Sequence, residues 1–164
     1  MAKSTPLFNT PMEAGLRALG VLVSHYPVGL QLDQLVMLDH IVVHSRDFGD
    51  EAPDSLHPPS PYRKAEPIVR RELIRLGLDL MVARGLIQRL PTKDGFRYSA
   101  SEYAASFMSA LQEPYWADLF KRGAWAAQRF GDMPADELSA LVRTRVDDWI
   151  AEFSETIGEI ESPS

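Results

Sequence analysis

The fold is decided by residues 66–99, which read EPIVRRELIRLGLDLMVARGLIQRLPTKDGFRYS. The spacing of apolar residues in the first half predicts a long helix that opens at Glu66 and Pro67. Gly85 is expected to end this helix, because glycine readily adopts the left-handed conformation that follows a helix C-terminus. The predicted apolar stripe of the helix comprises Val69, Leu73, Leu76 and Leu80.

A two-stranded hairpin is predicted directly after this helix. Residues 86–90 and 96–99 are rich in strand-forming side chains. Between them, Asp94 followed by Gly95 is a strong signal for a hairpin turn. The helix and the hairpin are therefore expected to form one continuous helix–strand–strand unit.

Two further helices are predicted upstream. Thr10 followed by Pro11 is a typical helix start, and this helix is expected to run to about His25. Asp33 is expected to cap a second helix. Three helices followed by a hairpin is the order of a winged helix-turn-helix, with the third helix as recognition element and residues 89–97 as the wing.

The rest of the chain adds a helical extension, so we expect a mainly α-helical protein. Helices are predicted to start near Ser101, Pro114 and Pro134. The expected organisation is a flexible arm at 1–9, a winged-helix domain at 10–100 with a proline-rich loop at 45–67, a C-terminal helical extension at 101–158 and a tail at 159–164.

Composition excludes several classes of site. The chain has 164 residues, of which 45% are apolar and 24% charged, as in an ordinary globular domain. It contains no cysteine, which excludes disulfide scaffolds, thiolate zinc sites, iron–sulfur clusters and cysteine nucleophiles. No apolar run is long enough for a membrane span or a signal peptide, so we expect a cytoplasmic protein without membrane contact.

Charge is unevenly distributed along the sequence. The net charge is −6, yet residues 59–98 carry nine Lys or Arg against four Asp or Glu. A basic middle in an acidic chain indicates a partner that meets only this region, although a solvated helix face gives the same pattern. The proline-rich loop, which holds Pro53, Pro58, Pro59, Pro61 and Pro67, is too irregular for a long helix or strand and is typical of a partner-binding surface.

Five stretches of the sequence carry a resemblance to a known family. They read LDHIVVHSRDFGD, SLHPPSPYRKAE, VRRELIRLGLDLMVARGLI, GFRYSASEYAASFMSAL and EPYWADLFKRGAW, and lie between about Leu35 and Phe130. This region resembles the middle component, type two, of bacterial three-component ABC ATPase systems, which include the Lamassu-type defence complexes. Arg46 stands where the family pattern has a glycine after His-Ser.

The resemblance implies a non-catalytic accessory subunit of an antiphage complex. Such a subunit would bind an SMC/Rad50-like ABC ATPase and connect it to an effector, typically a nuclease. ATP and catalytic metals would then belong to these partners, and no cofactor is expected on this chain. The rival hypothesis is a free-standing winged-helix transcriptional regulator that binds DNA by itself.

Three groups of residues are candidates for partner contacts. The first is a basic face and wing, for which double-stranded DNA reached through the complex and an acidic protein surface remain alternatives. It comprises Arg63, Lys64, Arg70, Arg71, Arg75, Arg89, Lys93 and Arg97. The second, a partner-binding loop, comprises Ser45, Asp47 and His57. The third, a set of partner-binding aromatics, comprises Trp116, Phe120 and Trp125.

Metal and catalytic sites are not predicted. His40 and His44 share a helix face, but Ile41 stands where a zinc-protease motif has glutamate. The histidines are instead expected to hold the following loop through hydrogen bonds. The loop contains serine, histidine and aspartate, yet the chain has no Gly-x-Ser-x-Gly elbow, no phosphate-binding loop and no outstanding carboxylate pair.

Overall fold

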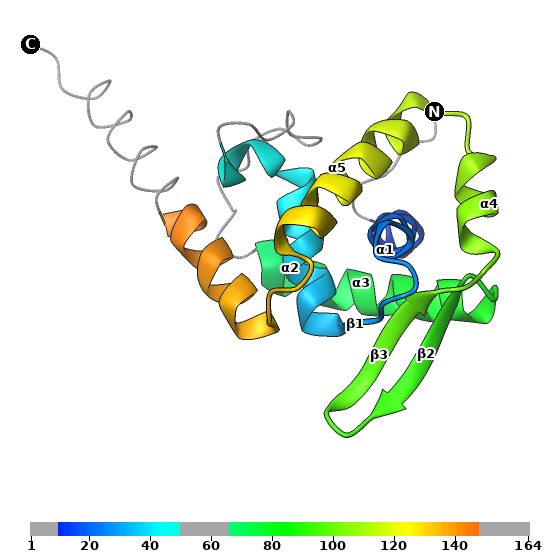
Figure 1. Ribbon diagram of the computed structural model, residues 1–164, viewed down its shortest axis with the longest axis horizontal. Coiled ribbons are helices and arrows are strands. Elements are labelled where there is room, and N and C mark those ends of the chain that lie inside the picture. The colour runs from blue at the N-terminus through cyan, green and yellow to red at the C-terminus, as the bar shows by residue number, and fades with distance from the viewer. Residues whose placement is uncertain (1–9, 50–65, 148–164) are drawn as a thin grey trace, which may run out of the picture.

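The structure, a computed structural model, describes residues 10–49 and 66–147 (Figure 1). Its mainly helical architecture, with a hairpin after the third long helix, confirms the predicted fold class. The elements are α1 (Pro11–Ser24), β1 (Leu30–Gln31), α2 (Leu32–Val43), the 3-10 helix η2 (Ser45–Phe48), α3 (Glu66–Ala83), β2 (Ile87–Thr92), β3 (Gly95–Ala100), α4 (Ala104–Ser109) and α5 (Pro114–Phe130). A last helix covers residues 135–147.

The helix boundaries follow local capping. The Thr10 hydroxyl accepts a hydrogen bond from the Glu13 N–H at 3.2 Å and so starts α1, as predicted. The predicted cap of α2 was wrong, because the N-cap of this helix lies two residues before Asp33. Gln31 is its N-cap, and the Gln31 N–H donates to the Gln34 side chain at 2.9 Å, while Asp33 lies within the first turn.

A small antiparallel sheet completes the winged-helix topology. Its strand order is β1-β3-β2, so β3 is central and β2 is an edge strand. Leu30 pairs with Tyr98, and Tyr98 pairs with Arg89 on the other side. The hairpin strand β2 extends to Thr92, beyond its predicted end at Leu90, since the turn needs only two residues before Gly95, whose φ is +108°.

Helices α1 and α3 contact each other backbone to backbone. A Cβ atom added to Gly77 would lie 2.5 Å from the Pro11 carbonyl oxygen, and one added to Gly15 would lie 2.6 Å from the Gly77 carbonyl oxygen. No side chain larger than hydrogen fits at this crossing without moving a helix. The two glycines therefore set the distance between the helices.

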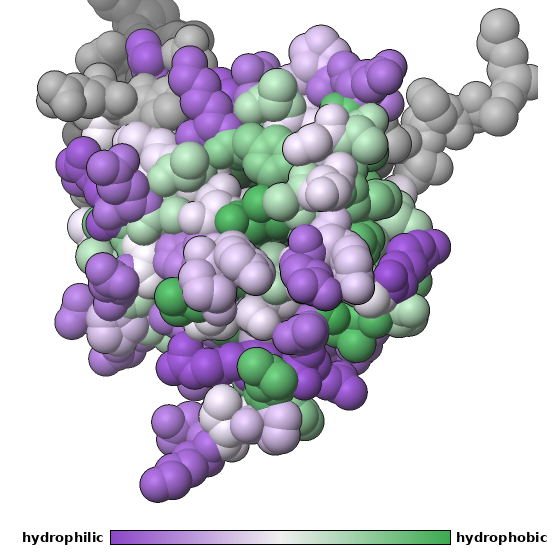
Figure 2. Space-filling view, turned by 45° about the vertical axis from the view of Figure 1, so that its right-hand side comes forward, coloured by the Kyte–Doolittle hydropathy of each residue, from purple (hydrophilic) through white to green (hydrophobic). Residues whose placement is uncertain are grey.

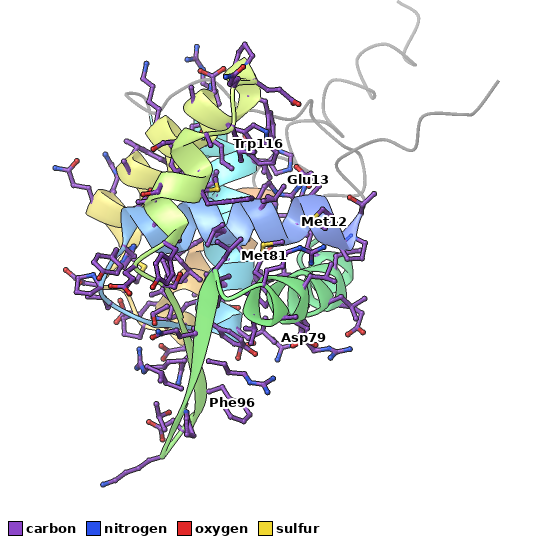
Figure 3. The ribbon with its side chains drawn as sticks, turned by 90° about the vertical axis from the view of Figure 1, so that its right-hand side faces the viewer. Met12, Glu13, Asp79, Met81, Phe96 and Trp116 are labelled. Carbon is purple, nitrogen blue, oxygen red and sulfur yellow. The ribbon has the colours of Figure 1, made fainter. Side chains whose placement is uncertain are left out.

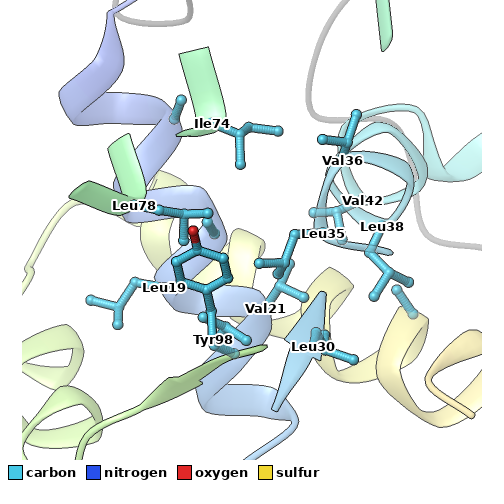
Figure 4. Close-up of a cluster of buried hydrophobic side chains, with 14 of the residues drawn as sticks. Leu19, Val21, Leu30, Leu35, Val36, Leu38, Val42, Ile74, Leu78 and Tyr98 are labelled. Carbon is cyan, nitrogen blue, oxygen red and sulfur yellow. The ribbon is translucent and has the colours of Figure 1, made fainter. Parts of the chain in front are cut away.

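The hydrophobic core lies between these helices, α2 and the inner face of the sheet (Figure 4). α1 contributes Leu19 and Val21, and the short strand β1 contributes Leu30. Further buried side chains come from α2, α3 and β3. They are Leu35, Val36, Leu38, Val42, Ile74, Leu78 and Tyr98.

The buried face of α3 differs from the predicted stripe. Ile74, Leu78 and Met81 are buried, whereas Leu76 is 38% exposed. The prediction placed Leu76 in the apolar stripe and grouped Arg70 with the basic face. Arg70 is nevertheless buried, so the buried face of α3 includes the flank that carries Arg70, Ile74 and Met81. Val69 lies outside the residues whose side chains are described.

The C-terminal extension packs onto the winged helix. α5 lies across α1 and α2, and the hairpin projects from the opposite side of the body (Figure 1). α4 begins at Ala104, three residues after the predicted start near Ser101. The last helix buries Leu138, Val142 and Val146. None of the described helices combines the length and the apolar character that a membrane crossing requires.

Candidate partner and nucleic-acid interface

The exposed arginines of α3 are held by neighbouring acids. Arg71 forms an ion pair with Asp33 of α2. Arg75 donates two hydrogen bonds to Glu72, at 3.1 and 2.6 Å, and also lies 3.6 Å from Asp79. The hydrogen bond from Arg75 lowers the pKa of Glu72, so this carboxylate is charged at neutral pH. A phosphate that approaches this face would have to compete with these carboxylates.

The basic residues of the wing are arranged differently. The Arg89 guanidinium lies 4.9 Å from the centre of the Phe96 ring. Arg97 donates a hydrogen bond to the Gly29 carbonyl at 3.1 Å and so ties the wing to the chain before β1. Lys93 stands exposed at the hairpin turn. The wing therefore presents its positive charge at its tip and along Arg89.

Arg70 is not part of the basic surface, which corrects the prediction. It is 7% exposed and donates to Asp39 at 2.8 Å. Arg17 donates to the other oxygen of Asp39, also at 2.8 Å, and forms an ion pair with Glu13. The Tyr115 hydroxyl donates to Glu13 at 2.8 Å. We call these five residues the buried charge cluster; they join α1, α2, α3 and α5.

The buried charge cluster balances two carboxylates with two guanidiniums. Burial alone would raise the pKa of Asp39, but the charges and hydrogen bonds of Arg17 and Arg70 outweigh it and hold the pKa below its ordinary value. Burial raises the pKa of Tyr115 to about 12, so its hydroxyl remains a donor at neutral pH. The charged groups of the cluster are therefore paired with one another and join the helices that carry them.

The predicted partner-binding loop begins inside the body of the protein. Ser45 is fully buried in η2, which corrects its assignment to a binding surface, and Asp47 is half-buried. His57 lies outside the described residues, as do Arg63 and Lys64 of the basic set.

The two histidines before this loop lie close together in the interior. The ring centres of His40 and His44 are 4.9 Å apart, and both side chains are buried. The part of the chain that the structure describes contains no group of three His, Cys, Asp or Glu side chains positioned to hold a metal ion.

The predicted partner-binding aromatics belong mostly to the packing of α5. Trp116 is only 8% exposed, and its ring packs edge-on against Tyr115 with centres 4.9 Å apart. Phe120 and Trp125 are half-buried against the core. Trp116 also lines a cavity of about 290 Å³ that opens between the first turns of α1 and α5, where Met12, Glu13 and Trp116 lie close together (Figure 3).

Sequence reasoning missed an apolar surface on the hairpin side of the molecule. Figure 2 shows apolar residues among charged ones over the projecting lower end. A second cavity, of about 500 Å³, opens between the hairpin and the segment before α4. Its neighbourhood exposes large apolar side chains, which periodicity did not reveal because they come from separate elements. They are Tyr26, Leu90 and Tyr103.

The fold and these surfaces define a winged-helix protein with a helical extension. The order of helix, short strand, two helices and hairpin carries the first part of this description, and α4, α5 and the last helix carry the second. Comparison with family models gives the family. Residues 7–152 match the model of ABC-three component (ABC-3C) system Middle Component 2, and the chain belongs to this family. No curated protein and no solved structure matches the chain.

Proposed function

We propose that this chain is a non-catalytic adaptor that connects the ATPase of its ABC-3C system to an effector component in the cytoplasm. Membership of the middle-component family is the observation that carries the proposal, because a middle component has partners within its own system. The finer assignment is an SMC/Rad50-like ATPase and a nuclease effector in a Lamassu-type antiphage complex. Nucleotide and metal chemistry would take place on those partners.

The buried charge cluster supports the non-catalytic part of this proposal. Among the described residues, its carboxylates and guanidiniums form ion pairs between buried side chains. They are buried and bound to one another, so they hold helices together and do not face a substrate. An adaptor that holds two partners in a fixed arrangement needs helices that are packed rigidly against one another.

The ion pairs on α3 support protein docking over direct DNA reading. Arg71 and Arg75 would have to leave their carboxylates to bind phosphates. A regulator that reads DNA with its third helix gains affinity from free cations on that helix. We therefore propose that any contact with double-stranded DNA is made through the assembled complex, with Lys93 at the wing tip as the residue best placed to contribute.

Co-expression with the other two components tests the proposal. An adaptor is expected to co-purify with the ATPase and the effector in fixed ratio, and to bind DNA weakly when alone. The double variant Arg71→Glu/Arg75→Glu then isolates the α3 face, without the disruption that Arg70→Glu would cause in the interior. Its matched control is Arg143→Glu/Arg145→Glu, a pair of exposed arginines on the last helix.

The winged-helix topology favours a second candidate, the free-standing regulator. A regulator is expected to dimerise and to bind a specific duplex alone, with an affinity that falls steeply as salt rises. It would lose that affinity in the α3 double variant and keep it in the control. Tight, sequence-specific binding by the isolated chain, with no stable association with an ATPase, would refute the adaptor proposal.

A further inference from the structure

Strand β2 has a free edge in the part of the chain that the structure describes. The sheet order β1-β3-β2 leaves one side of β2 without a neighbouring strand. The Ser101 N–H donates to the Leu86 carbonyl at 2.9 Å, one residue outside the pair formed by Ile87 and Ala100. In an antiparallel ladder this places Ile87 and Ala100 opposite each other without direct hydrogen bonds between them.

The alternation of the ladder fixes which backbone groups face outward. Gln88 and Leu90 direct their N–H and C=O groups to β3. Ile87 and Arg89 direct theirs away from the sheet, and Pro91 takes the next outward position, where its missing N–H costs the ladder nothing. The edge therefore offers two consecutive outward sets of donors and acceptors, which are the groups that an added strand needs.

One side of this edge is concave and is lined by both polar and apolar side chains. Gln88 and Leu90 line the cavity of about 500 Å³ together with Tyr26 and Tyr103. Leu90 is 50% exposed, Tyr26 57% and Tyr103 66%, so the cavity walls are open to a partner. A strand added to β2 would direct alternate side chains to this face. An apolar side chain of the added strand fits there.

The other side of the edge carries positive charge. Arg89 lies 3.7 Å from Asp79, and Arg75 approaches the same carboxylate at 3.6 Å. Arg75 is also paired with Glu72, whereas among the described residues Arg89 is paired with Asp79 alone, at a distance longer than a hydrogen bond. Phe96 packs under Arg89 and lies on the same side of the hairpin as Asp79 (Figure 3). Arg89 is thereby held in place for an acidic side chain from outside.

We propose that β2 receives an extended segment of another component of the ABC-3C system as a fourth strand. The segment would alternate acidic side chains, directed to Arg89, with apolar side chains, directed into the cavity beside Leu90 and Tyr103. The inference rests on the proposed adaptor function. It extends that function by naming the docking edge and the chemistry of the segment that binds there.

The test compares Arg89→Pro with Arg89→Thr in the co-expressed complex. Both variants remove the charge, but only proline removes the outward N–H, and neither touches a hydrogen bond of the β2–β3 ladder. We expect proline to weaken the complex about tenfold or more relative to threonine. Amide hydrogen exchange on the wild-type chain is the second measurement. The Ile87 and Arg89 amides should exchange rapidly in the isolated chain and slowly in the complex.

Each other outcome overturns the inference in a recognisable way. A complex that forms equally well with both variants, with Ile87 and Arg89 exchanging rapidly in it, leaves the adaptor function standing and refutes the docking edge. If the Ile87 and Arg89 amides already exchange slowly in the isolated chain at every concentration, the edge is covered by the chain itself. If their exchange slows as the concentration of the isolated chain rises, a second copy occupies the edge. Absence of any complex refutes the adaptor proposal, and the docking edge with it.

Discussion

Asp39 is the carboxylate that joins α1, α2 and α3, and Asp39→Asn is predicted to lower the free energy of unfolding by about 3–5 kcal/mol. The side chain is 1% exposed and accepts hydrogen bonds from Arg17 and Arg70, each at 2.8 Å. Asparagine keeps the shape but removes the charge. Two guanidiniums then remain buried with only Glu13 to balance them, and the loss is a large part of the about 5–15 kcal/mol that stabilises a typical domain.

The assay is urea denaturation followed by tryptophan fluorescence and far-UV circular dichroism. With a slope of about 2 kcal/mol per molar urea, the midpoint should fall by about 1.5–2.5 M. Asp33→Asn is the matched control, because it is the same substitution on the same helix and also faces an arginine of α3. That pair is exposed, so the control should lose about 1 kcal/mol or less. Equal losses in the two variants would refute the argument that burial makes Asp39 decisive.

The effect of Asp39→Asn should also depend on pH. Because the pKa of Asp39 is lowered in the folded protein, the ionised carboxylate contributes stability above the ordinary aspartate pKa. This contribution is lost as the pH falls through the lower pKa of the folded state. The difference between wild type and Asp39→Asn should therefore shrink on acidification below about pH 4. A difference that stays constant down to the acid transition would contradict the assigned direction.

Three further predictions follow from the packing. Gly77→Ala should destabilise the protein by about 1–3 kcal/mol despite the better helix propensity of alanine, since its Cβ meets the α1 backbone. In Gly123→Ala the close contact is to the Ser24 hydroxyl, and the Gly20 backbone lies at ordinary contact distance, so this control should stay within about 1 kcal/mol in thermal melts. Because the pKa of Tyr115 is raised to about 12, the wild type should lose stability as the pH rises from about 10 to 12. Tyr115→Phe should not show this loss, and a variant with the same alkaline profile as the wild type would contradict the argument. Leu90→Ser should leave stability within about 0.5 kcal/mol yet weaken the complex; a large loss of stability would show that Leu90 is a core residue.

The sequence predicted the type and order of the elements well, because the signals were local. Thr10 and Gly85 mark real helix ends, and Asp94-Gly95 marks the real hairpin turn. Such signals act within a few residues and need no knowledge of the fold. The start of α2 was missed because two glutamines, Gln31 and Gln34, supply the cap where Asp33 was the more typical candidate.

The candidate site was predicted less well, since it depends on contacts distant in sequence. Arg70 was grouped with the basic face, whereas in the structure it pairs with Asp39, 31 residues away, in the interior. The flank of α3 that carries Arg70 faces the interior, and Leu76 is 38% exposed. The Gly15–Gly77 crossing likewise has no local signature, because each glycine alone reads as a weak point in a helix.

Charge counted along the sequence is not charge presented on a surface, and this difference decides where a partner is to be sought. The basic middle of the chain holds nine Lys or Arg against four Asp or Glu, which left a DNA-binding face and a surface for an acidic protein as alternatives. In space, Asp33 arrives from α2 to pair with Arg71, and Asp39 takes Arg70 into the interior. The positive charge of α3, the helix that would read DNA in a winged-helix regulator, is therefore nearly balanced by neighbouring carboxylates. What remains exposed on the same module is a sheet edge beside Arg89, with a cavity on its other face that Leu90, Tyr26 and Tyr103 help to line. Such an edge suits an extended protein segment better than a duplex.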